Sequence, residues 1–151
     1  MMTASPTPGG RLASEDEQLH TEVSVTGDVV FMRACGPTSL ADMKHMFQIC
    51  QKVHEEYGYA LVLGDNRQAG KSTPAARKYQ TDMLRKRIFP SHTVIFGGDL
   101  ISRTAVLLVS RAVELVTGTK IPVDIVDDEA TARRLIGEAR DRFRAQGLAK
   151  K

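Results

Sequence analysis

The sequence contains few cysteines and no CxxC pair. Only Cys35 and Cys50 occur in the 151 residues, and they stand far apart. This spacing supplies neither the ligands of a zinc site nor a redox dithiol, so we expect two buried free thiols in a reducing cytoplasm. A chain of this length can bury a core that needs no disulfide or structural metal.

Long apolar runs are also missing. The first 18 residues lack the apolar segment of a signal peptide. No later stretch reaches the roughly 20 apolar residues that cross a bilayer. We therefore predict a flexible tail over residues 1–18, one domain over 19–147 and a short basic tail over 148–151. The protein is expected to be soluble and cytoplasmic, with no membrane insertion.

Charge is distributed unevenly, and aromatic residues are few. Residues 1–66 hold 4 basic and 9 acidic side chains, whereas residues 67–151 hold 17 and 9. Only Tyr79 and Phe89 could stack on a nucleic-acid base in the most basic segment. We interpret that segment as a solvated helix face and regard nucleic-acid binding as unlikely. Its basic residues are Arg67, Lys71, Arg77, Lys78, Arg85, Lys86 and Arg87.

The front of the chain predicts a hairpin followed by a helix. Alternating apolar residues flank the turn Thr26–Asp28, as in an antiparallel strand pair. Ser39 and Asp42 have capping-box spacing, and an apolar stripe continues from there to about Tyr57 and Gly58.

The rest of the chain alternates between strand and helix patterns. Thr73 and Pro74 suit the start of one helix, and Asp127 or Asp128 suits the cap of the last. The order ββαβαβαβα predicts an α/β fold with a mixed five-stranded sheet and four helices. Further strands are expected at 59–63, 93–96 and 121–126, and further helices from 74 to before Pro90, over 100–117 and over 129–143.

The segment Gly70-Lys71-Ser72-Thr73 invites comparison with a P-loop. The earlier glycine of that motif is replaced by Asp65, and Pro74 removes an amide from the first helical turn. The sequence also lacks a nucleophile elbow, the acidic cluster of phosphoacceptor receivers and zinc-ligand histidine spacing. We predict neither an enzyme nor a cofactor or metal.

Two loops are candidates for an interaction surface or a phosphoacceptor. They should lie at the carboxyl ends of parallel strands, where open α/β sheets place functional residues. A phosphate on the serine or threonine at the helix start would be favoured by the helix dipole, although an ordinary cap explains the same residues. The candidates are Asp65, Ser72, Thr73, Gly97, Gly98 and Asp99.

The helix expected at 100–117 is apolar on more than one face. Leu107 and Leu115 remain after one face is assigned to the sheet, which suggests a partner or dimer contact. The alternative is burial under a neighbouring helix. The residues assigned to the sheet are Ala105, Val106, Leu108, Val109, Ala112, Val113 and Val116.

Over residues 20–146 the sequence resembles the bacterial STAS-like (SpoIIAA-like) family of anti-sigma-factor antagonists, a fold that neighbours the CRAL-TRIO lipid-binding proteins. The resemblance is carried by ALVLGD, by VIFGG before an apolar helix, and by IPVDIVDDEATARRLI. It implies that a partner kinase phosphorylates a serine at the helix start, which here matches Ser72 or Thr73. Lys71 departs from this pattern, because the family has aspartate there.

These observations predict a non-enzymatic cytoplasmic regulatory domain that binds another protein, such as a kinase or regulator, or a second copy of itself as a homodimer. Phosphorylation at a helix N-terminus would switch the binding. The alternative is a carrier of a small molecule or lipid, with a pocket between the sheet and helix 100–117.

Overall fold

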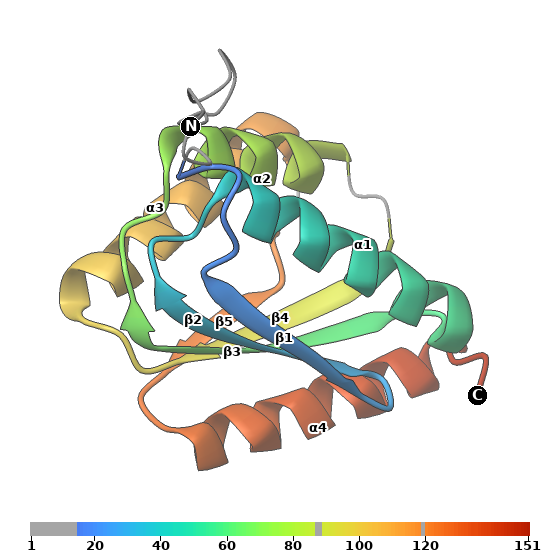
Figure 1. Cartoon of the computed structure of the whole chain (residues 1–151). Helices are drawn as coiled ribbons and strands as arrows, with labels where there is room; N and C mark the ends of the chain where they lie inside the picture. The colour runs from blue at the N-terminus through green and yellow to red at the C-terminus, as the bar shows by residue number, and fades with distance from the viewer. Residues whose placement is uncertain (1–14, 87–88, 119) are drawn as a thin grey trace, which may run out of the picture.

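The computed structural model describes residues 15–86, 89–118 and 120–151, which fold into a sheet with helices on both faces (Figure 1). The predicted order ββαβαβαβα is confirmed. The elements are β1 (Thr21–Thr26), β2 (Val29–Gly36), α1 (Leu40–Tyr57), β3 (Ala60–Ala69), α2 (Pro74–Lys86), β4 (Ser91–Phe96), α3 (Leu100–Thr117), β5 (Val123–Val126) and α4 (Glu129–Ala145).

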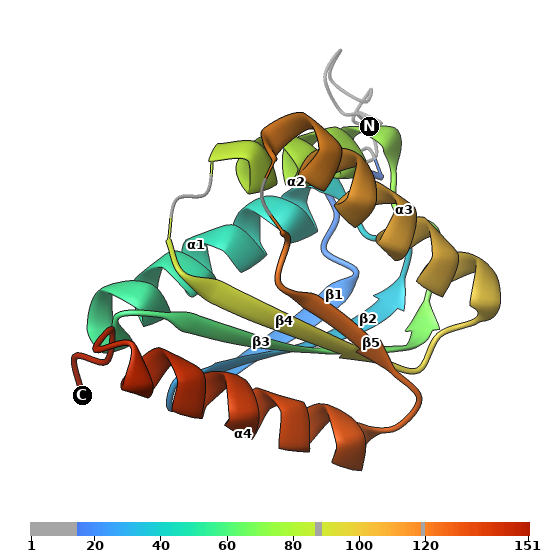
Figure 2. The ribbon, with the colours of Figure 1, turned by 180° about the vertical axis from the view of Figure 1, so that it is seen from behind.

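The five strands lie in the sheet in the order of the sequence. β1 pairs with β2 as an antiparallel hairpin, and β2 to β5 run parallel. Because each right-handed crossover steps in the same direction, α1, α2 and α3 all lie on one face. α4 lies alone on the opposite face, as the two views show (Figures 1 and 2).

Each face of the sheet has its own core. The core beneath α1 and α2 includes Val30, Met43, Met46, Cys50, Val53, Ala60, Val62 and Ala76. The core beneath α4 includes Tyr59, Leu61, Leu63, Val94, Phe96, Ala132, Ile136 and Ala139. α3 packs mainly against α2, and in the described residues its one buried apolar side chain is Val113.

The helix caps formed as the sequence predicts. The Ser39 hydroxyl accepts from the Asp42 amide at 3.0 Å, and the Asp42 carboxylate accepts from the Ser39 amide at 2.9 Å. α1 ends at Gly58, whose φ of 91° is in the left-handed region that favours glycine. Thr73 caps α2, and Asp128 caps α4 through the amide of Thr131 at 2.7 Å. These caps fix where three of the helices begin.

Both predicted tails are bound to the domain where the structure describes them. The Asp16 carboxylate accepts from the Leu40 amide at 3.1 Å and from the Thr73 hydroxyl. At the other end, the Lys150 amide donates to the Tyr57 carbonyl at 2.8 Å. Asp16, which lies in the expected flexible tail, is therefore held against the domain, and residues 1–14 of that tail lie outside the described part.

Two local predictions were wrong. β3 does not end at Leu63 but continues to Ala69, because β2 is long enough to pair with it beyond a bulge, with Gly36 opposite Ala69. Cys50 is buried, and burial raises its pKa to about 12. Cys35, however, is exposed, because the alternation of β2 gives the buried position to Ala34.

In the described residues, no helix has the length and apolar character that crossing a membrane requires.

Candidate functional site

A buried carboxylate lies at the carboxyl edge of the sheet between two arginines. The parallel register places Arg33 beside Asp65, and Arg67 follows two residues along the same strand face. Arg67 donates to the Asp65 carboxylate through Nε at 3.0 Å and Nη2 at 2.7 Å, while Nε of Arg33 lies 3.5 Å from Oδ2. Only 3% of the Asp65 side chain is exposed.

These contacts keep Asp65 ionised. Hydrogen bonds from the Arg67 side chain and amide, with the charges of Arg67 and Arg33, lower the pKa of Asp65 more than burial raises it. A carboxylate with a lowered pKa is a weak base and, near neutral pH, cannot donate a proton. Asp65 is therefore suited to hold the two arginines in place.

The turn after β4 is shaped to accept Arg67. The guanidinium lies 5.5 Å from the centre of the Phe96 ring. Gly97 has a φ of 75°, and a Cβ atom there would lie 2.5 Å from Cγ of Arg67. Gly98 also has a positive φ, of 84°, and Asp99 is exposed directly before α3. Arg67 therefore lies against two of the predicted site residues, Asp65 and Gly97.

The two predicted phosphoacceptors lie apart from this cluster, at the start of α2. Thr73 is buried, its hydroxyl donates to the Asp16 carboxylate, and it also accepts from the Ala76 amide at 3.1 Å. Ser72 is half-buried, and its carbonyl accepts from the Arg77 guanidinium. Ser72 is the more accessible hydroxyl of the two.

Leu107 and Leu115, predicted as a partner face, are 44% and 87% exposed. The assignment of Leu108 and Val116 to the sheet was wrong, because α3 packs against α2 and leaves these side chains 63% and 66% exposed. Ala105 and Ala112, which were assigned to the sheet with them, are exposed as well. We define the exposed side of α3 as the α3 face. Its large apolar residues are Leu100, Ile101, Leu107, Leu108, Leu115 and Val116.

The sequence contains a further signal for this face in the spacing of three apolar residues. Ile101, Leu108 and Leu115 follow one another at intervals of seven residues, the spacing of a seam that packs against another helix. The predicted sheet-facing stripe included Leu108 and did not include Ile101.

The described residues hold no group of three or more His, Cys, Asp or Glu side chains arranged to bind a metal ion. The Asp65 carboxylate is already occupied by arginines. At the carboxyl edge of the sheet, Asp65 therefore holds two arginines in place through ion pairs. The α3 face is the larger exposed feature of the described residues.

Comparison with known proteins identifies the fold. No protein-family model matches the chain, and no curated protein matches it. One similar solved structure is an uncharacterized protein of the DUF3478 family with a SpoIIAA-like fold, from Shewanella loihica PV-4. Its TM-score is 0.50 at 13% identity, covering 77% of this chain and 91% of that one. The likeness confirms the predicted STAS-like, SpoIIAA-like fold.

A second similar structure is the anti-sigma factor antagonist SpoIIAA in its unphosphorylated form. It has a TM-score of 0.44 and 12% identity, and the match covers 82% of this chain and 97% of that one.

Proposed function

We propose that this chain is a non-enzymatic regulatory domain that binds a partner protein through the α3 face. The observation that supports this is the concentration of exposed apolar side chains. Of the eight large exposed hydrophobic residues in the described part of the chain, six lie on α3, and the other two are Leu19 and Val25. A contiguous apolar patch of this kind marks an interaction surface more often than scattered residues do.

The shape of the α3 face fits a helix. Ile101, Leu108 and Leu115 rise along one side of α3 and span roughly 21 Å, at about 1.5 Å per residue. Ala105 and Ala112, both exposed, lie between them and leave room for side chains of a partner. An amphipathic helix can place its own apolar stripe along this seam.

The charges around the face favour an acidic partner. Arg111 is exposed within the stripe, and α2, which packs beside α3, exposes Lys78, Arg85 and Lys86. A second copy of the chain would bring these like charges together, which opposes association. We therefore propose a partner whose apolar stripe is flanked by Asp and Glu, and regard a homodimer as the competing outcome.

The sequence resemblance to the STAS-like family extends this proposal, because it implies that phosphorylation switches the binding. Ser72 precedes α2, where the helix dipole favours a phosphate, and Arg77 already reaches its carbonyl. We propose that a partner kinase modifies Ser72 in the cytoplasm, a location that the free thiols of Cys35 and Cys50 support. Intact-mass analysis of the protein from its own host tests this, because Ser72→Ala should remove the phosphate and Thr73→Ser should not.

The binding proposal is tested by affinity capture from a lysate of the native host with three forms of the chain. The wild type and Val25→Ser, which removes an exposed apolar side chain far from α3, should retain the same protein. Leu108→Ser/Leu115→Ser should lose it. Capture of the same proteins by all three forms would contradict the proposal.

Sedimentation velocity of the purified wild type distinguishes the second copy from a different partner. We expect a monomer at micromolar concentration, because a second copy would bring the exposed basic residues of α2 and α3 close to one another. A dimer that Leu108→Ser/Leu115→Ser dissociates would assign the α3 face to a second copy instead.

A further inference from the structure

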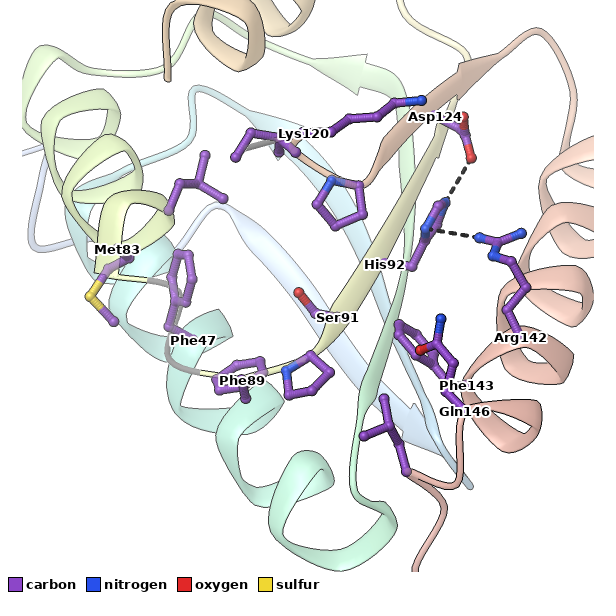
Figure 3. A pocket seen from close by; sticks show the side chains of 15 residues that line it. Phe47, Met83, Phe89, Ser91, His92, Lys120, Asp124, Arg142, Phe143 and Gln146 are labelled. Carbon is purple, nitrogen blue, oxygen red and sulfur yellow. Dashed lines mark hydrogen bonds and ion pairs between the residues drawn. The ribbon is translucent and has the colours of Figure 1, made fainter. Parts of the chain in front are cut away.

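A groove with a volume of about 870 Å³ lies apart from the α3 face and the Asp65 cluster, whose residues do not line it. Its walls come from Phe47 of α1, the ends of α2 and α4, the start of β4, and the start of β5 with the residues that lead into it (Figure 3). In the described residues none of its lining side chains belongs to α3, so it differs from the pocket that the carrier hypothesis placed beside helix 100–117. Its volume is within the range of small-molecule sites.

A chain of hydrogen bonds fixes the polar end of the groove. His92 is 8% exposed, its Nε2 lies 2.7 Å from Oδ2 of Asp124, and its Nδ1 lies 3.3 Å from Nη2 of Arg142. A guanidinium can only donate, so Nδ1 accepts and Nε2 carries the proton shared with Asp124. The single carboxylate at this end of the groove is thus engaged by His92.

Arg142 retains its positive charge toward the groove. Its side chain contacts Nδ1 of the His92 ring, and no carboxylate of the described residues lies within ion-pair distance of it. Lys120 extends toward the same polar end (Figure 3). The polar end of the groove therefore offers the Arg142 guanidinium, which no carboxylate of the described residues pairs with, and this favours an anion.

The other end of the groove is apolar. Phe47, Met83 and Phe89 lie on the side away from Arg142 (Figure 3). Phe89 stacks on His54 with 5.1 Å between ring centres, and Phe47 meets Tyr79 edge-on at 5.8 Å. Because these contacts hold both rings in place, the apolar wall exists before any ligand binds.

We propose that this groove binds an organic carboxylate that has an apolar body about the size of two fused rings. The carboxylate accepts hydrogen bonds from the Arg142 guanidinium, and the body lies against Phe47, Met83 and Phe89. A guanidinium matches the two oxygens of a carboxylate in one plane. Inorganic phosphate would fill only the charged end and leave the apolar wall in water. This inference does not depend on the α3 face.

The test is displacement of the fluorescent probe 1-anilinonaphthalene-8-sulfonate by two competitors of similar shape, one an anion and the other neutral. Naphthalene-2-carboxylate should displace the probe at about one tenth the concentration that naphthalene-2-carboxamide needs, because hydrogen bonds to a charged group are stronger than neutral ones. Inorganic phosphate should not displace it. Equal potency of carboxylate and carboxamide, or displacement by phosphate, would overturn the proposal.

Three variants locate the binding. Arg142→Gln should abolish the preference for the carboxylate, whereas Arg134→Gln on the same helix, which changes the net charge equally outside the groove, should keep it. Leu108→Ser/Leu115→Ser should also keep it, which separates the groove from the α3 face. A preference that survives Arg142→Gln, or that the α3 variant removes, would contradict the assignment.

Methyl spectra of the methionines provide a readout that does not depend on the dye. Met83 lines the groove, whereas Met43 is buried on the side of α1 that packs against the sheet. Naphthalene-2-carboxylate should shift the Met83 methyl signal and leave that of Met43 in place. The opposite pattern would place the ligand elsewhere.

Discussion

Helices α3 and α4 have almost the same length, with 18 and 17 residues, but they relate to the sheet in different ways. α4 is rich in charged residues and still buries Ala132, Ile136 and Ala139. α3 is the more apolar helix and exposes most of its large side chains. The apolar content of a helix therefore indicates that its surface packs against other residues. It does not say whether those residues belong to the same chain or to another molecule.

The difference follows from the order of the strands. All three crossovers step the same way, so α3 reaches a face that α1 and α2 already cover, and it packs against α2. α4 follows the last strand and has the opposite face to itself (Figure 2). The α3 face is therefore left exposed, whereas α4 covers the opposite face of the sheet.

The largest expected effect concerns the ion pair that holds α4. Arg140 donates to the Asp28 carboxylate through Nε and Nη2, both at 2.8 Å, and the buried Tyr59 hydroxyl donates to it at 2.7 Å. Asp28→Ala leaves both donors without their acceptor and should lower the free energy of unfolding by about 4 kcal/mol. Urea denaturation measures this loss.

The matched control is the ion pair at the start of α3. Asp127, whose side chain is 84% exposed, lies 2.8 Å from Arg103. Asp127→Ala should cost less than about 1 kcal/mol, because solvent screens an exposed pair. Equal losses of unfolding free energy for Asp28→Ala and Asp127→Ala would mean that α4 is held no more firmly than α3.

The second prediction compares one apolar residue on each helix. Ile136→Ala on α4 removes a side chain that is 4% exposed and should cost about 3 kcal/mol of unfolding free energy. Leu115→Ala on α3 removes one that is 87% exposed and should change stability by no more than about 0.5 kcal/mol. A large loss from Leu115→Ala in the isolated chain would show that the α3 face is covered within the molecule.

The smallest effect is a dependence on pH. Burial alone would raise the pKa of Asp28, but hydrogen bonds from Arg140 and Tyr59 and the charge of Arg140 together lower it. The pKa of Asp65 is also lowered, chiefly by Arg67. Carboxyl groups with lowered pKa values stabilise the fold above the unfolded value of about 3.9 and lose this contribution as the pH falls through the folded values.

The stability of the wild type should therefore fall as the pH is lowered below about 4, the unfolded value. Asp28→Asn/Asp65→Asn should be less stable at neutral pH and lose less on acidification. Urea denaturation at several pH values measures both slopes. If the unfolding free energies of the wild type and the variant fell equally steeply with pH, other carboxyl groups would dominate the loss of stability in acid.

Elements whose structure depends on local chemistry could be predicted from the sequence. Ser39 and Asp42 specify the start of α1 without distant partners, and Thr73 does the same for α2. The hairpin follows from its alternation and turn. These signals sit within a few residues of the feature that they predict, which is why the element order was correct.

Features that depend on register could not be predicted in this way. The polar residues after Leu63 read as a loop, and only pairing with β2 makes them part of a strand. Arg33 reaches Asp65 because the two strands run parallel in that register. The groove joins His92, Asp124 and Arg142 from three separate elements. No local pattern records such distances.

The most direct test of the α3 face is site-specific photo-crosslinking in the native host. A benzoylphenylalanine at position 115 lies on the α3 face, and one at position 25, which is half exposed on β1, serves as the control. Irradiation should give one defined adduct with an acidic partner protein from position 115 and none from position 25. No adduct from position 115, or the same adducts from both positions, would contradict the proposal that α3 is the binding surface.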